Sequence, residues 1–275
     1  RVFDALRARC SLYGPRRFPG RGRFTNTDLV KYAQLNGLEE LELEEKSYMS
    51  PKSLAFPADE TLFYFTGQEF AEAPQDGEGE IVVFLRPCDI NGFRRLDAMF
   101  LENGGTRDPY YQRRRERLRF FMIECTESFD NCFCVSMKSN TADDYSAALR
   151  FSGDSVLVEV KDDEFEGVFS AGRPSGFKPE FVRENRKRVD VPDVDEMPPE
   201  MFAHPMWDEY DQRCIACGRC NTSCVTCTCF STRDLFYSDS RLSGERRRVW
   251  DGCHLDGFTE MAGGASYREK KGERM

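Results

Sequence analysis

The sequence has 275 residues, of which 40% are hydrophobic, and its 23 Phe and 10 Tyr are enough to build a buried core in about two domains. Its net charge of −9 excludes a general nucleic-acid binder, because neutralising phosphates requires an excess of Lys and Arg. The longest apolar run, residues 81–85, is far shorter than the roughly 20 residues of a membrane span, and 12 cysteines without an export signal indicate a reducing, cytoplasmic setting.

Residues 1–190 have the pattern of a mixed α/β domain. Short apolar runs between Gly, Pro and charged residues predict buried strands at 62–65, 81–85, 120–123 and 156–160. Apolar residues at helical spacing predict a helix over 90–100, and Asp108 followed by Pro109 is typical of the start of a second helix over 110–118. The predicted order from residue 81 onward is strand, helix, helix, strand.

Four cysteines of this domain follow the predicted strands. Cys88 comes after the strand 81–85 and before the next helix, whose N-terminus would favour the thiolate form of its side chain. Cys125 comes after the strand 120–123, and Cys132 and Cys134 follow soon afterwards. If the two strands are parallel neighbours, these cysteines meet at one sheet edge and could hold a further cluster. The alternative is four buried, structural thiols.

The rest of the chain divides into a linker and a cysteine-rich domain. Residues 191–205 contain four prolines in an acidic segment and predict a linker. Residues 206–275 show little hydrophobic periodicity, so we expect metal ligation to replace core burial as the source of stability. The predicted fold class is therefore α+β, a mixed α/β N-terminal domain followed by a ferredoxin-like, cysteine-rich iron–sulfur domain.

Cysteine spacing is the strongest functional signal in this second domain. Cys214, Cys217, Cys220 and Cys224 form a C-x2-C-x2-C-x3-C run, which is typical of bacterial ferredoxins that bind 4Fe–4S clusters. Gly218 is expected to relieve the backbone beside the second ligand. Zinc sites use two separated cysteine pairs instead, so a zinc-binding interaction module is the alternative from another class. The two histidines, His204 and His254, have no Ser or carboxylate partner at motif spacing, so no catalytic residue is predicted.

Several motifs together resemble one family. The run 214–220, Thr-Cys-Thr-Cys at 226–229, Gly-Glu-Arg-Arg-Arg-Val-Trp at 244–250 with Cys253, and Met-Ala-Gly-Gly at 261–264 are similar to the A subunit of anaerobic (dissimilatory) sulfite reductase. In the first domain, residues 86–91, 124–137 and 144–150 look like the same subunit and, more loosely, like the beta subunits of soluble sulfhydrogenases. The resemblance covers most of the chain.

The resemblance implies an electron-transfer subunit. It would relay electrons from a flavin- and nicotinamide-binding subunit to a siroheme catalytic subunit that reduces sulfite to sulfide, and the alternative is a sulfhydrogenase beta subunit. Family members carry a second C-x2-C-x2-C run that this chain lacks, so we expect the iron–sulfur domain to be incomplete at its C-terminus. In the family's pattern Cys224 would serve a second cluster, and the first would take Cys214, Cys217, Cys220 and a cysteine of the missing run. Without that run, one 4Fe–4S cluster would recruit a local fourth ligand, with Cys224 as the leading candidate and Cys227, Cys229 and Cys253 behind it.

A basic group beside the cysteines is the remaining candidate feature. Arg246, Arg247 and Arg248, with Arg268, Lys270 and Lys271, form a local positive region in an acidic chain. Such a region could dock an acidic electron-transfer partner, and the alternative is a solvated charged surface.

Overall fold

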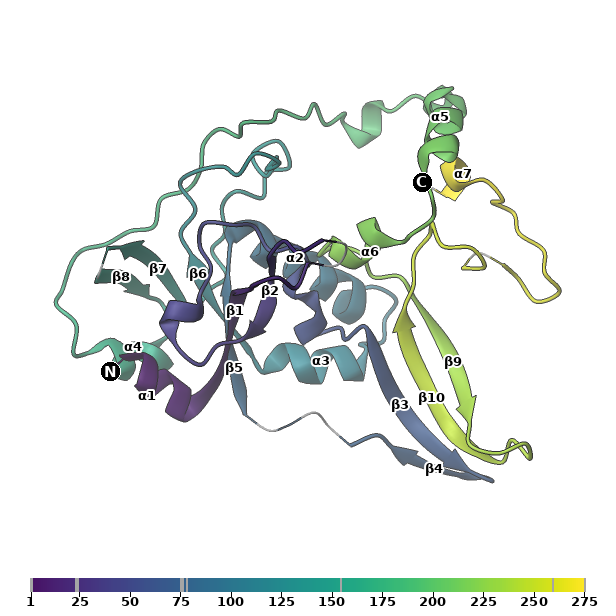
Figure 1. Cartoon of the computed structure of the whole chain (residues 1–275), viewed down its shortest axis with the longest axis horizontal. Helices are drawn as coiled ribbons and strands as arrows, with labels where there is room; N and C mark the ends of the chain where they lie inside the picture. The colour runs from purple at the N-terminus through teal and green to yellow at the C-terminus, as the bar shows by residue number, and fades with distance from the viewer. Residues whose placement is uncertain are drawn as a thin grey trace. The chain divides into compact units, whose positions relative to one another are not determined.

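The computed structural model describes residues 2–22, 25–74, 77, 79–153, 155–258 and 260–274. The chain divides into two compact units that do not coincide with two continuous halves of the sequence. The first unit comprises Arg1–Phe56 and Asp76–Val191, and the second comprises Pro57–Gln75 and Pro192–Met275 (Figure 1).

A six-stranded sheet forms the centre of the first unit. Its strand order is β2-β1-β5-β6-β7-β8, with the four central strands parallel and both edge strands antiparallel to their neighbours. The strands are β1 (Cys10–Phe18), β2 (Leu29–Gln34), β5 (Glu80–Leu85), β6 (Leu118–Ile123), β7 (Ala147–Ser152) and β8 (Ser155–Val160). Strands β5, β6 and β8 correspond to predicted runs, and the mixed α/β class of this unit is confirmed.

The helices between β5 and β6 are those that the sequence predicted. They are α2 (Pro87–Asp97), a short π-helical turn η3 (Ala98–Glu102) and α3 (Pro109–Glu116). Asp108 caps α3, and its carboxylate accepts hydrogen bonds from the backbone N–H groups of Tyr110 (3.0 Å) and Tyr111 (2.9 Å). The remaining helical segments of the unit are α1 (Val2–Arg9), α4 (Glu166–Phe169), η1 (Leu38–Glu40), η2 (Pro51–Leu54) and η4 (Asp163–Phe165).

Apolar side chains cover both faces of this sheet. On one face, Phe93 of α2 packs on Phe120 of β6, with ring centroids 5.0 Å apart. On the other, Phe121 contacts the rings of Phe84 (5.8 Å) and Phe165 (5.0 Å). Alternation along β6 therefore sends neighbouring Phe side chains into two apolar layers, which is the arrangement of a sheet that is buried on both sides.

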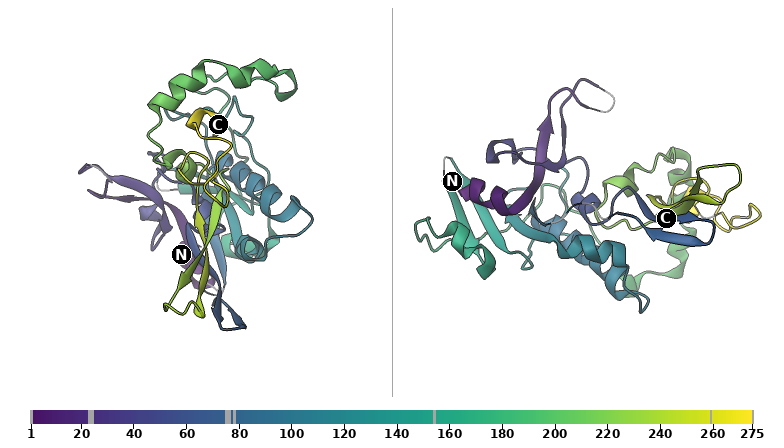
Figure 2. Two further views of the ribbon diagram at one scale, coloured as in Figure 1. Left: turned by 90° about the vertical axis from the view of Figure 1, so that its right-hand side faces the viewer. Right: turned by 90° about the horizontal axis from the view of Figure 1, so that it is seen from below.

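The second unit is built on a four-stranded antiparallel sheet of order β4-β3-β10-β9. Its strands are β3 (Asp59–Thr66), β4 (Glu69–Glu72), β9 (Phe230–Phe236) and β10 (Ser243–Trp250). Figure 2 shows the β3–β4 hairpin running beside the β9–β10 hairpin, although the two are far apart in the sequence. Sequence reasoning assigned residues 62–65 to the domain 1–190, whereas the structure places this strand in the sheet of the second unit.

The helical elements of the second unit are short. They are η5 (Val194–Glu196), η6 (Pro199–Ala203), α5 (Met206–Arg213), α6 (Arg219–Ser223) and α7 (Lys271–Arg274). The proline-rich segment expected as a linker, 191–205, carries the two 3-10 turns η5 and η6. Among the residues described, no helix is long and apolar enough to cross a membrane.

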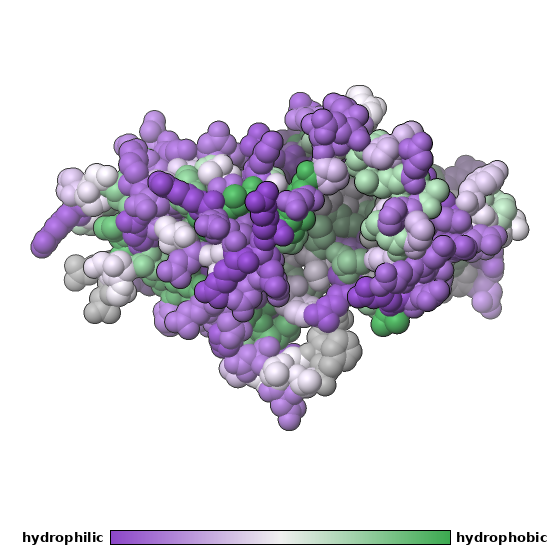
Figure 3. All heavy atoms as spheres, turned by 90° about the horizontal axis from the view of Figure 1, so that it is seen from above, coloured by the Kyte–Doolittle hydropathy of each residue, from purple (hydrophilic) through white to green (hydrophobic). Residues whose placement is uncertain are grey.

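The buried side chains differ in kind between the two units. All of the buried apolar side chains identified among the described residues, from Leu6 to Val182, belong to the first unit. In the second unit the buried side chains are polar or charged: Glu60, Asn221, Glu245, Arg248 and His254. Hydrophilic side chains also dominate the face drawn in Figure 3. The second unit thus has no hydrophobic core within the described part of the chain, as the lack of periodicity in 206–275 predicted.

Candidate metal centre

The C-x2-C-x2-C-x3-C run lies between α5 and the strand β9. Helix α5 ends at Arg213, and the backbone N–H of Cys214 donates to the carbonyl of Tyr210 at 2.9 Å. Cys220 lies in α6, and Cys224 directly follows that helix, where its N–H bonds the carbonyl of Cys220 at 3.1 Å. Cys217, Cys220 and Cys224 are exposed and Cys214 is half-buried, so all four thiols are accessible to a ligand.

Two residues of the loop between Cys214 and Cys220 adopt left-handed backbone conformations. Ala216 has φ of 53° and Gly218 has φ of 65°. Left-handed residues in a short loop can turn successive N–H groups into a concavity that suits anions, including iron–sulfur clusters. The sequence correctly singled out Gly218, but in the structure the crowding comes from Leu255, because a Cβ at position 218 would lie 2.8 Å from its Cδ2 atom.

Asn221 connects three of the cysteines. Its side chain is buried, and its Nδ2 atom donates to the sulfurs of Cys227 (3.5 Å) and Cys253 (3.8 Å). The Sγ atom of Cys220 lies 3.5 Å from the Oδ1 atom of the same amide. Cys220, Cys227 and Cys253 therefore converge on one buried amide, although 33 positions separate the first from the last.

His254 is the second buried polar group at this point. Its Nδ1 atom lies 3.4 Å from Cys220 Sγ and 3.3 Å from Asn221 Oδ1. Burial, and then the positive charge of Arg274, lower the pKa of the imidazole, so His254 is neutral near pH 7. Sequence reasoning gave neither Asn221 nor His254 a role. The only available signal was that each directly follows a cysteine, and this pattern alone predicts nothing.

The remaining cysteines of the second unit occupy two places. The sulfur of Cys224 lies 3.1 Å from Thr226 Oγ1, away from the Asn221 amide contacts. Burial, followed by the nearby Cys227 thiol, raises the pKa of Cys229 to about 11. Cys229 is thus grouped with Cys227, and a bound metal ion would deprotonate such thiols.

The donor chemistry fits an iron–sulfur cluster. Four thiols recur at ferredoxin spacing, on a loop whose backbone takes the left-handed turns described above. Across the described ranges, no three His, Cys, Asp or Glu side chains are arranged to hold a single metal ion. The cluster assignment therefore depends on thiol spacing and on the family comparison reported below.

The four candidate cysteines of the first unit follow the ends of two strands, as predicted. Cys88 is the second residue of α2, directly after β5, and Cys125 follows β6. Cys132 and Cys134 lie in the loop between β6 and β7. Burial, and then the charge of Asp89, raise the pKa of the Cys88 thiol well above its ordinary value, which opposes the effect expected from the helix N-terminus.

The predicted positive region at 246–248 is largely neutralised within the second unit. Arg246 pairs with Asp234 on β9 at 2.7 Å, and Arg247 pairs with Asp59 on β3 at 2.9 Å. Arg248 is buried, and its Nε atom donates to Glu60 at 2.6 Å. These arginines bind neighbouring strands together, so the docking face expected from the sequence is not formed by them.

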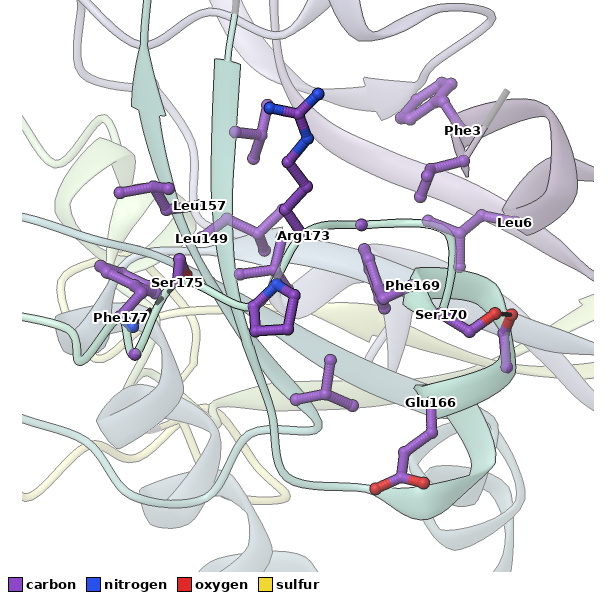
Figure 4. Close-up of a pocket in the computed structure, with 18 of the residues that line it drawn as sticks. Phe3, Leu6, Leu149, Leu157, Glu166, Phe169, Ser170, Arg173, Ser175 and Phe177 are labelled. Atoms are coloured by element: carbon purple, nitrogen blue, oxygen red, sulfur yellow. Dashed lines mark hydrogen bonds between the residues drawn. The ribbon is translucent and has the colours of Figure 1, made fainter.

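The first unit also contains an apolar cavity of about 1000 Å³, shown in Figure 4. Side chains from α1, β8, α4 and the segment after α4 line it, including Phe3, Leu157 and Phe169. Glu166, Arg173 and Lys178 supply its charged groups. Its described lining contains no Cys or His, so this cavity has no thiol or imidazole for a metal centre.

Comparison with known protein families identifies the class of the cysteine-rich region. Residues 213–275 match the family described as a 4Fe-4S dicluster domain. This part of the chain binds 4Fe–4S clusters, one or two in number, and the fold class predicted from the sequence is confirmed. The zinc-module alternative finds no support in this match.

Comparison of the whole chain points to a particular relative. The chain is 27% identical over 297 aligned residues to sulfhydrogenase 2 subunit beta of Pyrococcus furiosus, and the alignment covers 99% of this chain and 82% of the relative. No solved structure matches. The chain is an iron–sulfur electron-transfer protein, and this similarity supports the sulfhydrogenase alternative better than the sulfite reductase expected first.

Proposed function

We propose that this chain is the electron-relay subunit of a sulfhydrogenase-type complex. It would carry single electrons between a flavin- and nicotinamide-binding subunit and a hydrogen-activating subunit. The observation that carries the proposal is the extent of the similarity, which covers 99% of the chain and so includes both units rather than the cluster domain alone. The chain's own part is to hold the clusters in position and to tune their potentials through thiolate ligation, hydrogen bonds to sulfur and burial.

Within the second unit, the proposed ligands of one 4Fe–4S cluster are Cys214, Cys217, Cys220 and Cys224. Their spacing is the ferredoxin pattern, and the left-handed turns at Ala216 and Gly218 shape the loop that carries the first three. The second candidate for the fourth ligand is Cys253. It is favoured by its contact with His254, whose ring also contacts Cys220 at 3.4 Å.

Serine variants distinguish the two candidates for the fourth ligand. We expect Cys224→Ser to lose about four irons per chain, as Cys217→Ser does, and Cys253→Ser to retain them. Iron and acid-labile sulfide would be measured after anaerobic purification. Cys10→Ser is the matched control, because Cys10 is buried in β1 of the first unit, outside both groups of cysteines. Iron loss in Cys253→Ser with retention in Cys224→Ser would assign the fourth ligand to Cys253.

The complex itself tests the proposed function. We would purify the tagged full chain with its partners anaerobically and compare hydrogen-dependent reduction of a viologen dye with hydrogen-dependent reduction of nicotinamide. The dye accepts electrons without the relay, so Cys217→Ser should lose the nicotinamide reaction and keep the dye reaction. Cys10→Ser should keep both. A complex that reduces sulfite and does not oxidise hydrogen would overturn the proposal.

A further inference from the structure

We propose that Cys88, Cys125, Cys132 and Cys134 of the first unit bind a further 4Fe–4S cluster, separate from the family-matched region 213–275. The first observation is the register of two strands. Strands β5 and β6 are parallel neighbours, and Leu85 pairs with Met122. Cys88 and Cys125 each lie three residues beyond this pair, so both follow the paired ends of adjacent strands, which are about 4.8 Å apart.

The loop after β6 is fastened so that it stays at this edge of the sheet. Cys125 forms a parallel bridge with Phe181, and its carbonyl accepts a hydrogen bond from Val182 N–H at 2.8 Å. At the other end of the loop, the Nδ2 atom of Asn91 on α2 donates to the carbonyl of Thr141 at 2.7 Å. The helix that carries Cys88 is thus tied directly to the loop that carries the other three cysteines.

Asn185 holds the middle of the loop. Its Oδ1 atom accepts the N–H of Val135 at 2.8 Å, and its Nδ2 atom lies 3.4 Å from the sulfur of Cys134. Amide donors to sulfur are a means by which proteins set the potential of iron–sulfur clusters. The hydrogen bond from the Val135 backbone would be enough for Asn185 to hold the loop in place. Its contact with Cys134 adds an N–H donor beside a sulfur that a cluster would use as a ligand.

The charges around the four thiols also suit an anionic cluster. The guanidinium of Arg86, the residue before α2, lies 4.7 Å from the ring centroid of Phe129, in the loop that carries Cys125, Cys132 and Cys134. All four thiols are half-buried and free, with no disulfide among them. A positive charge and four reduced thiols at one sheet edge fit thiolate ligation of a cluster.

The test separates this site from the clusters of the second unit. In the full chain, Cys132→Ser combined with Cys134→Ser should lose about four irons and four sulfides relative to the unaltered protein, while Cys10→Ser loses none. EPR of the reduced variant should keep the signal of the second unit. Unchanged iron in the double variant, or loss of zinc in place of iron, would overturn the proposal.

A complementary variant guards against loss of iron through misfolding. The seven cysteines of the second unit are replaced by Ser in the full chain: Cys214, Cys217, Cys220, Cys224, Cys227, Cys229 and Cys253. This protein should still bind about four irons and absorb near 400 nm, because its first unit keeps its own hydrophobic core. A variant that contains no iron, although its circular dichroism spectrum shows that the first unit is folded, would contradict the assignment.

Discussion

The two units of this chain use different sources of stability. The first buries an apolar layer on each face of a parallel sheet, whereas the described side chains buried in the second are an ion pair, an amide, a carboxylate and an imidazole. Burial of apolar surface supports a fold without a ligand, but a unit without such a core depends on its metal ligands. We therefore expect cluster binding and folding to be coupled in the second unit and to be separate events in the first.

Removal of iron should therefore have the largest effect, and it should be confined to one unit. Chelation of the anaerobic protein is expected to abolish hydrogen-exchange protection in β9 and β10 and to leave β5 and β6 protected, because only the latter lie in an apolar core. Peptide-level exchange measured before and after chelation checks this. Reconstitution with iron and sulfide is the control. Equal protection of both units after iron removal would contradict the comparison.

Phe121→Ala should destabilise the first unit and leave the second unit folded. Phe121 is fully buried between Phe84 and Phe165, so its truncation is expected to cost the first unit about 3–5 kcal/mol. Denaturant unfolding followed by circular dichroism measures the loss, and the cluster absorbance of the second unit reports whether that unit is spared. The matched control is Phe70→Ala in the second unit, where the side chain is 72% exposed and truncation should change little.

Breaking the buried ion pair of the second unit should have the next largest effect. Arg248 and Glu60 join β10 to the inserted strand β3, and both side chains are almost completely buried. Arg248→Met leaves Glu60 buried without its partner, at an expected cost of about 3–5 kcal/mol in the holo-protein, lessened if water reaches the site. Thermal loss of cluster absorbance measures it. Arg246→Met breaks the exposed pair with Asp234 and should cost less than about 1 kcal/mol.

Gly218→Ala should have the smallest effect of this set, and a second glycine separates its two causes. Both Gly218 and Gly67 have left-handed backbones, but only Gly218 would bring a Cβ against Leu255, at 2.8 Å. Gly67→Ala should cost about 1 kcal/mol from strain alone, and Gly218→Ala should cost more. The rate of cluster loss in the presence of a chelator compares them. Equal rates would show that packing on Leu255 contributes nothing.

The sequence predicted the fold best where the pattern was local. The runs at 81–85 and 120–123 are continuous and apolar, and Asp108 followed by Pro109 marked the start of α3 correctly. The arginines at 246–248 concealed strand β10, because their charges are neutralised by partners on neighbouring strands. The transfer of 57–75 to the second unit depends on pairing between segments far apart in the chain, which no local pattern records.

The residues of the candidate sites also divide into those that a local sequence pattern predicts and those that only the fold brings together. Ferredoxin spacing alone predicts Cys214, Cys217 and Cys220 as ligands, because one short loop delivers them. Asn221 and His254 could not be predicted, since their contacts with Cys220, Cys227 and Cys253 arise only when β9 and β10 return the chain to α6. The four candidate cysteines of the first unit lie between these cases: the strand ends predict a common edge, and the register of β5 and β6 shows that the two strands are parallel neighbours.

Iron analysis of the unaltered full chain, combined with an EPR-monitored redox titration, tests the central claim most directly. With one cluster in the second unit and one in the first, we expect about eight irons and eight sulfides per chain, and at least two one-electron signals with separate potentials. A second cluster in the dicluster domain would raise the iron count to about twelve. A colourless protein that contains zinc, or one that contains no iron after anaerobic reconstitution, would contradict the account.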